Sequence, residues 1–396
     1  MAGLGFFSRA SSTNCPYIEN IQLPGKHFWF TSYRALYSYF IKKTILYFVS
    51  GHGFGHISRS SVIIKELLNR NHKIVLISNR NSFLEAYSHP SLTLVDYSFD
   101  VGLVQRSSLA IDFPETLKAY DQYQAQKKIH SKFINQLLFD YSPAALLSDC
   151  AALPLSIAGL ADIPALFIGN FSWDFIYRHY NKLDSLWGDF ADELAHEYSY
   201  TSHAFILPFS CPMNAFKQKT QTGLIGRVPT ESRENMRTKL NFEDQFQYLL
   251  LSFGAYGLDF SELKLEDIPP SVKLISPALP GTPAHPQIQQ VNGNFTNLLQ
   301  ACDAVLTKPG YGILAEAHAT NTPVLYTDRG DFIEYRYLLE AMNKHHRAQY
   351  ISQEDLYSMN IEAPLINLLG MNSEQVIKLK PGLAELVKQI EHAIER

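Results

Sequence analysis

The stretch TILYFVSGHGFGHISRSSVIIKELLNRNHKIVLI, residues 44–77, decides the fold. It opens with an uninterrupted apolar run, Ile45–Val49, which is typical of a strand buried on both faces of a parallel sheet. A glycine-rich loop follows, then a helix with periodic apolar residues that ends at Asn71, then a second apolar run, Lys73–Ile77. This order of strand, loop, helix and strand over about thirty residues predicts one βαβ unit.

The same alternation continues along the rest of the chain. Further buried strands are predicted at Ala144–Asp149, Ala165–Ile168, Tyr248–Ser252, Val272–Ile275, Ala304–Thr307 and Pro323–Thr327, with helices between them. Strands that alternate with helices predict an α/β protein with parallel sheets covered by helices on both faces. The last apolar-periodic stretch, residues 383–394, predicts a closing amphipathic helix.

The strand pattern stops and restarts once, which indicates two Rossmann-like domains. A charged helical segment, Glu231–Asn241, is interpreted as the linker between them. We therefore expect an N-terminal extension over residues 1–43, a first domain over 44–230 and a second over 231–396. Ligands of such sheets bind at the carboxyl ends of the strands, so the cleft between the two sheets is the expected site.

The composition excludes several classes of function. The 396 residues are 46% hydrophobic, which is enough for sizeable cores and excludes wholesale disorder. Lys+Arg 34 against Asp+Glu 38 leaves a net charge of −4, without the basic excess of a nucleic-acid binder. The four cysteines lie far apart and form no C-x-x-C pair, so neither a zinc knuckle nor a disulfide framework is predicted. Reduced thiols fit a cytoplasmic protein.

The segment before the first strand is rich in aromatic residues. Residues 27–43 carry seven of them, with basic residues between. Arg34, Lys42 and Lys43 interrupt the apolar stretch, so no membrane span is predicted, and residues 1–12 lack the apolar core of a signal peptide. Two interpretations stay open: a helix packed on its own domain, or an interfacial helix that makes peripheral membrane contact.

The first glycine loop is the leading candidate for catalysis. Gly51, Gly53 and Gly55 let the backbone approach a ligand closely, and the helix that follows offers free N–H groups to an anion. His56, at the strand end, is placed to act as a general base, with His52 as the alternative. The plainer interpretation is a tight turn whose histidines only form hydrogen bonds. The glycines argue against a helical i,i+4 pair of histidines, so no metal site is predicted.

Three further stretches carry candidate binding residues. Ser252–Gly257 and Lys308–Gly312 are small-residue turns that suit a diphosphate, and Glu316, one helical turn later, could accept hydrogen bonds from ribose hydroxyls. The stretch from Asn170 to Phe175 joins a strand to a helix and could bind carbohydrate through Asn170 and Trp173. Ordinary βα turns and helix caps are the alternative in each case.

The candidates divide by role. The catalytic candidates are His56, His52 and Asp149, the last orienting His56 or capping a helix. The donor-binding candidates are Ser252, Gly254, Lys308, Gly310, Tyr311, Gly312, Glu316, Asp331 and Glu334. The acceptor-binding candidates are Gly53, Phe54, Gly55, Arg59, Asn170, Ser172, Trp173 and Asp174.

Four motifs carry a family resemblance: GHGFGHISR (51–59), NFSWDFIY (170–177), LLSFG (250–254) and KPGYGILAEA (308–317). Together they resemble GT-B glycosyltransferases, and more closely the glycosyltransferase-like half of the L-arabinokinases, over about residues 44–345. The chain contains no P-loop or kinase phosphate loop, so kinase activity is not implied. The peptidoglycan-precursor GlcNAc transferases are more distantly similar.

The resemblance implies a nucleotide-sugar donor, most simply a UDP-sugar, held by the second domain, and no cofactor or metal. Gly55-His56 stands where the GlcNAc transferases have an acceptor-facing histidine, and Gly310, Gly312 and Glu316 match their donor loop and ribose-binding glutamate. The chain lacks their Asp-Gln pair, and Glu334 is assigned that part. Carbohydrate, lipid-linked and protein acceptors are all open.

Three functions remain after this comparison. The first is a metal-independent, inverting glycosyltransferase. The second is a module that binds a sugar or nucleotide sugar without transfer, and the third is a nucleotide-sugar epimerase.

Overall fold

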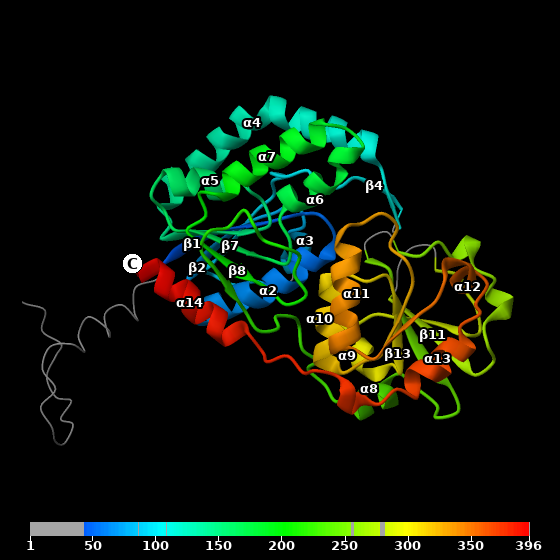
Figure 1. Ribbon diagram of the computed structural model, residues 1–396. Helices are drawn as coiled ribbons and strands as arrows, with labels where there is room; N and C mark the ends of the chain where they lie inside the picture. The colour runs from blue at the N-terminus through cyan, green and yellow to red at the C-terminus, as the bar shows by residue number, and fades with distance from the viewer. Residues whose placement is uncertain (1–42, 86, 108, 255–256, 278–281, 396) are drawn as a thin grey trace, which may run out of the picture. The chain divides into compact units, whose positions relative to one another are not determined.

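The computed structural model describes residues 43–85, 87–107, 109–254, 257–277 and 282–395. The predicted N-terminal extension, with its aromatic segment and Cys15, therefore lies outside the described residues apart from Lys43. In the described part the strands form a parallel seven-stranded sheet, a parallel six-stranded sheet and a short antiparallel hairpin, β4 (Gln105–Ser107) with β5 (Ala110–Ile111). The α/β prediction with two parallel sheets is confirmed (Figure 1).

The first sheet has the order β3-β2-β1-β6-β7-β8-β9. Its strands are β1 (Thr44–Val49), β2 (Lys73–Ile77), β3 (Leu92–Val95), β6 (Ala145–Asp149), β7 (Ala165–Gly169), β8 (His203–Ile206) and β9 (Lys219–Gln221). In β1 every residue after Thr44 is buried, as the apolar run predicts. The register places Val49 opposite Asp149, so β1 and β6 end side by side and bring their following loops together.

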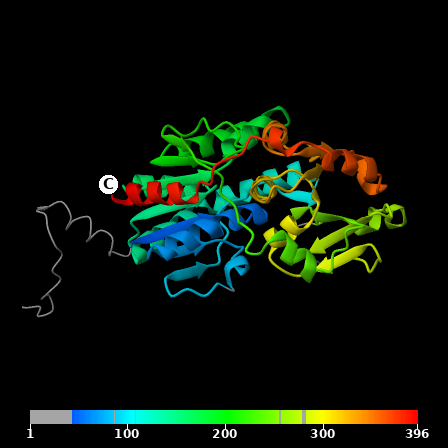
Figure 2. The same ribbon diagram turned by 90° about the horizontal axis from the view of Figure 1, so that it is seen from below.

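Helices cover both faces of this sheet (Figures 1 and 2). They are α2 (Phe54–Asn69), α3 (Ser82–Glu85), α4 (Phe113–Tyr141), α5 (Leu153–Leu160), α6 (Trp173–His179) and α7 (Leu186–Tyr198). Side chains of α4 to α7 share one hydrophobic cluster with the sheet, and those of α2 share another. The apolar pattern does not predict α4, because only six of its 29 residues are buried.

The second sheet has the order β12-β11-β10-β13-β14-β15. Its strands are β10 (Gln247–Ser252), β11 (Val272–Pro277), β12 (Ile288–Val291), β13 (Ala304–Thr307), β14 (Val324–Tyr326) and β15 (Ala348–Tyr350). The helices around it are α8 (Arg233–Lys239), α9 (Phe295–Ala301), α10 (Tyr311–Thr320), α11 (Glu334–His345), α12 (Gln353–Tyr357) and α13 (Glu362–Leu369). Like the first, this sheet carries a hydrophobic cluster on each face.

The helix predicted as a linker packs against the second sheet and its helices. Helix α8 packs against α9, and Met236 lies in the same cluster as residues of β10. Arg233 and Arg237 both donate hydrogen bonds to the carboxylate of Asp303, at 2.6 and 3.2 Å. Its charges therefore anchor α8 to the sheet, and the connection between the sheets is the shorter stretch from residue 222 to 232.

The closing helix α14 (Leu383–Glu395) does not pack on the second sheet. Leu386, Val387 and Ile390 are buried in the cluster that covers β1 and α2 of the first sheet (Figure 2). Residues 383–395 thus complete the first core, which a division into 44–230 and 231–396 does not anticipate. Amphipathic periodicity predicts that a helix buries one face, but it does not say against which partner.

We expect Ile390→Ala to lower the free energy of unfolding by about 2–5 kcal/mol, because Ile390 is fully buried and its removal leaves a cavity. Lys388→Ala, on the exposed face of the same helix, should change it by less than about 0.5 kcal/mol. Urea denaturation measures both. Equal small effects would contradict the assignment of α14 to the first core.

Candidate active site

The turn after β1 places the two candidate bases differently. Gly53 has a φ of 77°, a left-handed conformation that glycine adopts without strain, and α2 begins at the next residue. His56 therefore lies in the first turn of α2, whereas His52 lies in the loop before it. His56 is buried, with 7% of its surface exposed.

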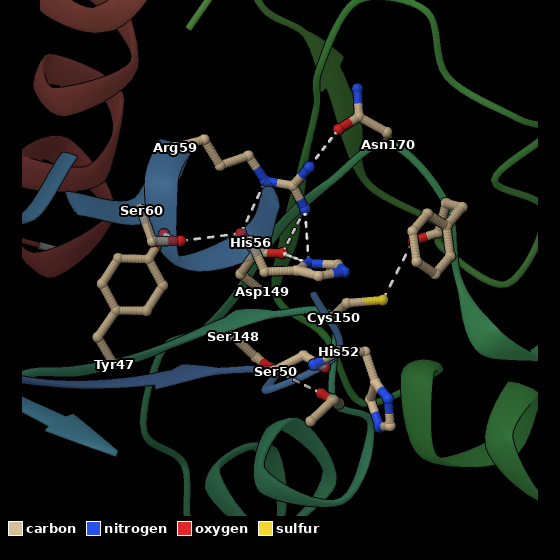
Figure 3. Close-up of polar contacts among 12 residues, drawn as sticks. Tyr47, Ser50, His52, His56, Arg59, Ser60, Ser148, Asp149, Cys150 and Asn170 are labelled. Atoms are coloured by element: carbon tan, nitrogen blue, oxygen red, sulfur yellow. Dashed lines mark hydrogen bonds and ion pairs between the residues drawn. The ribbon is translucent and has the colours of Figure 1, made fainter. Parts of the chain in front are cut away.

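His56 and Asp149 form a hydrogen-bonded pair. Nδ1 of His56 lies 2.8 Å from Oδ1 of Asp149, the last residue of β6 (Figure 3). Nη2 of Arg59 also lies 3.0 Å from Nδ1. In the tautomer that donates Nδ1–H to the Asp149 carboxylate, the lone pair lies on Nε2, which is then the nitrogen that can accept a proton. The structure thus brings together the two residues that the sequence names as base and orienting group.

Arg59 and Ser60 bind the same carboxylate. Arg59 Nε donates to Oδ2 at 2.7 Å, Arg59 Nη2 forms an ion pair with Oδ1, and Ser60 Oγ donates to Oδ2 at 2.8 Å. Arg59 Nη1 also donates to Oδ1 of Asn170 at 2.5 Å (Figure 3). Because its guanidinium is held in this way and is 5% exposed, Arg59 is a partner of Asp149, not an exposed ligand for an acceptor.

Charge keeps Asp149 ionised. Complete burial would raise the pKa of its carboxyl, but Arg59 and His56 outweigh that effect and hold the pKa at about 2. The negative charge is therefore present at neutral pH, 2.8 Å from Nδ1 of His56. Arg59 neutralises part of the charge.

A second histidine–aspartate pair lies next to the first. Nε2 of His52 is 3.7 Å from Oδ1 of Asp100, and the His52 ring packs edge-on against Trp173. Burial lowers the pKa of His52, more than Asp100 raises it, so His52 is neutral at pH 7. Asp100 follows β3 in a loop without a recognisable pattern, so the sequence gives no sign of it.

The predicted carbohydrate platform is buried. Trp173 is 6% exposed, and its ring packs on Phe171 and Tyr177. The side chain of Asn170 accepts from Arg59 and donates to the carbonyl of Pro208 at 2.6 Å. Neither side chain is open to a sugar in this structure. Aromatic rings cover Trp173, and hydrogen bonds with Arg59 and Pro208 occupy the amide of Asn170.

The helix start in this motif retains unused polar groups. Ser172 occupies the N-cap position of α6, but its hydroxyl makes no capping bond and is buried without a partner. One oxygen of Asp174 and the indole N–H of Trp173 are buried without partners as well. Burial raises the pKa of Asp174.

The loops predicted to bind a donor meet at the ends of β10 and β13. Thr307 Oγ1 donates to the carbonyl of Ser252 at 2.5 Å, and Gly254 has a φ of 74°. Gly310 is the N-cap of α10 and makes no side-chain cap, so the first N–H groups of that helix are available to an anion. Ala255 and Tyr256, part of the predicted turn, lie outside the described residues.

Lys308 stands beside these loops. Burial, together with the nearby charge of Arg329, lowers the pKa of its amine to about 7. A bound diphosphate would favour the protonated form.

The motif at residues 308–317 of the second domain contacts the first domain directly through two of its residues. The ring of Tyr311 stacks on Phe171 with centroids 5.7 Å apart, and its hydroxyl lies 3.2 Å from Sγ of Cys211. A Cβ added to Gly312 would come within 3.3 Å of Gly55 Cα, so the two glycine loops nearly touch. Tyr311 thus packs between the two domains, and its predicted contact with a donor stays a prediction.

Glu316 is also engaged. Oε1 accepts from Ser58 Oγ at 3.1 Å and from Arg227 Nε at 2.7 Å, and Oε2 accepts from Arg227 Nη2 at 3.1 Å. A small cavity beside it is lined by residues of both domains, among them Arg59, Asn170, Tyr311 and Glu316.

Asp331 and Glu334 differ in their exposure to solvent. Glu334 begins α11, is buried, and lies 3.9 Å from Arg329. Asp331 has 58% of its side chain exposed, and its backbone carbonyl accepts from the hydroxyl of Tyr180. The Asp331 carboxylate lies 3.7 Å from His179 Nε2 and is largely exposed, whereas the buried Glu334 faces Arg329.

Within the described part of the chain, no helix is long and apolar enough to cross a membrane. Over the same residues, no three His, Cys, Asp or Glu side chains gather as a metal site would require. The three cysteines described, Cys150, Cys211 and Cys302, are free and buried.

Comparison with known proteins identifies the architecture. The calicheamicin glycosyltransferase CalG4 superposes with a TM-score of 0.62 over 90% of this chain and 99% of its own, at 15% identity. The UDP complex of UGT89C1 from Arabidopsis thaliana gives 0.59 over 89% and 100%, at 12% identity. The chain has the GT-B fold. The GT-B prediction from the motifs is thereby confirmed.

The sequence comparison agrees with the predicted resemblance to the L-arabinokinases. L-arabinokinase from Arabidopsis thaliana is 25% identical over 351 residues, which are 85% of this chain and 32% of that protein. The chain thus spans about a third of the length of this curated relative. No family model matches the chain.

Proposed function

We propose that this GT-B protein transfers a sugar from a nucleotide-sugar donor to an acceptor hydroxyl, without a metal and with inversion. The observation that carries the proposal is the His56–Asp149 pair, held at 2.8 Å at the start of α2 and at the carboxyl ends of β1 and β6. A buried histidine oriented by an ionised carboxylate is the arrangement that general-base catalysis requires.

The proposed reaction has one displacement step. Nε2 of His56 takes the proton of the acceptor hydroxyl, and the acceptor oxygen forms a bond to the anomeric carbon. The bond from that carbon to the diphosphate oxygen breaks on the opposite face, which inverts the configuration. We expect the first N–H groups of α10 and the Lys308 amine to stabilise the departing diphosphate.

Solved structures with this fold support the proposed donor and acceptor classes. Structures of UGT89C1 are described as complexes with UDP, UDP-L-rhamnose and quercetin. We propose a UDP-sugar donor on this basis, with a hydroxylated small molecule or carbohydrate as acceptor. Lipid-linked and protein acceptors stay predictions, as do the cytoplasmic location and any membrane contact through residues 27–43.

A binding module without transfer is the second candidate, and one observation favours it. Arg59 already neutralises part of the charge on Asp149, and Arg227 already occupies Glu316. Both contacts would suit a protein that kept the fold and lost the reaction. An epimerase would act on UDP-GlcNAc in acceptor-free buffer, so product analysis there separates this third candidate.

A thermal-shift screen with UDP, GDP, TDP and ADP, alone and as sugar conjugates, tests the proposal. A nucleotide present at 100 times its dissociation constant stabilises the folded state by about 2.7 kcal/mol, which the assay detects easily. We expect a shift with UDP or a UDP-sugar. No shift with any nucleotide would contradict a donor site and favour a different ligand.

A further inference from the structure

Arg227 contacts residues of both domains. It lies in the connection between β9 and α8, and its guanidinium is 5.6 Å from the ring centroids of both Phe83 and Phe295. Phe83 belongs to α3 of the first domain and Phe295 to α9 of the second. The same guanidinium forms two hydrogen bonds with Glu316 of α10, at 2.7 and 3.1 Å.

The carboxylate of Glu316 already accepts three hydrogen bonds. Both of its oxygens accept from Arg227, and Oε1 also accepts from Ser58, which lies on α2 of the first domain. Glu316 is only 4% exposed, so water cannot replace a lost partner freely. A ligand that hydrogen-bonds to Glu316 must therefore share this buried carboxylate with Arg227 and Ser58 or displace one of them.

The contacts lie next to the paired connections between the sheets. Leu224, three residues before Arg227, accepts from Gly382 N–H and donates to the carbonyl of Lys380, each at 2.8 Å. Gly223 and Gly382 are packed so closely that a Cβ on either would clash with the other's backbone. The two chain segments that cross between the domains are thus hydrogen-bonded to each other, and together they form a compact joint. Beside this joint, the contacts of Glu316 with Arg227 and Ser58 hold the two domains together as a clamp.

We infer that Arg227 is a latch: it holds the two domains together through Glu316 and competes with a nucleotide for that carboxylate. The inference rests on the proposed function, because it takes the ribose hydroxyls of the donor as the competing group. Nucleotide binding frees Arg227 and loosens the joint, and loss of nucleotide restores the clamp. A ligand shifts such an equilibrium only by its preference for one state, and Glu316 supplies that preference here.

The test compares Arg227→Met with a matched control. Methionine keeps an apolar stem between the two phenylalanine rings but removes both hydrogen bonds to Glu316. Arg70→Met is the control, since Arg70 also pairs with two glutamates, Glu66 and Glu391, and its side chain is 28% exposed against 29% for Arg227. Ser58→Ala is the second variant, because it weakens the clamp without leaving Glu316 as a buried charge that lacks its cation.

Two readouts are measured on the full chain. Calorimetric titration with UDP should show about tenfold tighter binding for Arg227→Met, within the range usual for coupled sites, with a smaller gain for Ser58→Ala and none for Arg70→Met. Amide hydrogen exchange at Leu224 and Gly382 should be faster in ligand-free Arg227→Met than in wild type. UDP should produce the same acceleration in wild type. Circular dichroism confirms that each variant is folded.

The outcomes separate the latch from the proposed function. Weaker UDP binding by Arg227→Met would make Arg227 a ligand of the nucleotide and overturn the latch. Unchanged affinity together with unchanged exchange would overturn it too. If neither wild type nor any variant binds UDP although exchange rises in Arg227→Met, the proposed function is at fault, and the competition for Glu316 falls with it.

Discussion

Replacing His56 with alanine should reduce sugar transfer by about 10²–10⁴-fold, the usual contribution of a general base. The physical reason is that Nε2 of His56 accepts the acceptor proton while Asp149, 2.8 Å from Nδ1, stabilises the resulting imidazolium. Nucleotide binding should be unchanged, because the donor loops belong to the second domain. Initial rates with a UDP-sugar and an acceptor found by screening, together with UDP titration, measure the two effects separately.

His52→Ala is the informative comparison for this prediction. His52 has its own aspartate, Asp100, at 3.7 Å, and it could take the role of base if the acceptor entered on that side. A large loss in His52→Ala with full activity in His56→Ala would move the base to His52. His196→Ala, on the exposed face of α7, should leave the rate unchanged.

Asp149→Asn should lower the free energy of unfolding by about 3–5 kcal/mol, the usual cost of breaking a buried ion pair by removing one partner. The change leaves the Arg59 guanidinium, 5% exposed, without its carboxylate, and it disturbs the hydrogen bonds from Ser60 and His56. Urea denaturation at pH 7 measures the loss. Glu391→Gln, which weakens the partly exposed pairs with Arg70 and His72, should cost no more than about 1 kcal/mol.

The same carboxylate predicts a pH dependence. Because the folded-state pKa of Asp149 is about 2, below the ordinary value of 3.8, its contribution to stability is complete above pH 4 and falls as the pH drops from 4 towards 2. Wild type should therefore lose more stability over this range than Asp149→Asn does. Parallel curves for the two proteins would contradict the depressed pKa.

Much of the architecture is legible in the sequence because it follows from local patterns. The runs Ile45–Val49 and Tyr248–Leu251 are apolar throughout, as a strand covered on both faces requires. The glycines after each run mark the turns at the carboxyl ends of the strands, where the site lies. Long-range partners have no such signature, and so the packing of α14 on the first sheet and of α8 on α9 emerged only from the structure.

The candidate site divides in the same way. His56 and Asp149 could be predicted because each ends or follows a strand with a clear pattern, and neighbouring parallel strands end together. Asp100 and Arg227 could not, because each lies in an irregular connection and acquires its role from a partner far along the chain. Trp173 was predicted to be exposed to sugar, but aromatic neighbours cover it, and the sequence alone does not reveal which face of a side chain is covered.

The sequence by itself determined the two parallel sheets, the GT-B resemblance and the loops that carry the candidate chemistry, since strand periodicity and glycine turns depend on near neighbours. Only the tertiary structure decided which of those residues remain available to a ligand. Arg59 binds Asp149, Tyr311 packs into the other domain, and Glu316 is held by Arg227 and Ser58. Availability depends on charge pairing and burial across hundreds of residues, and these are set when the two domains pack together.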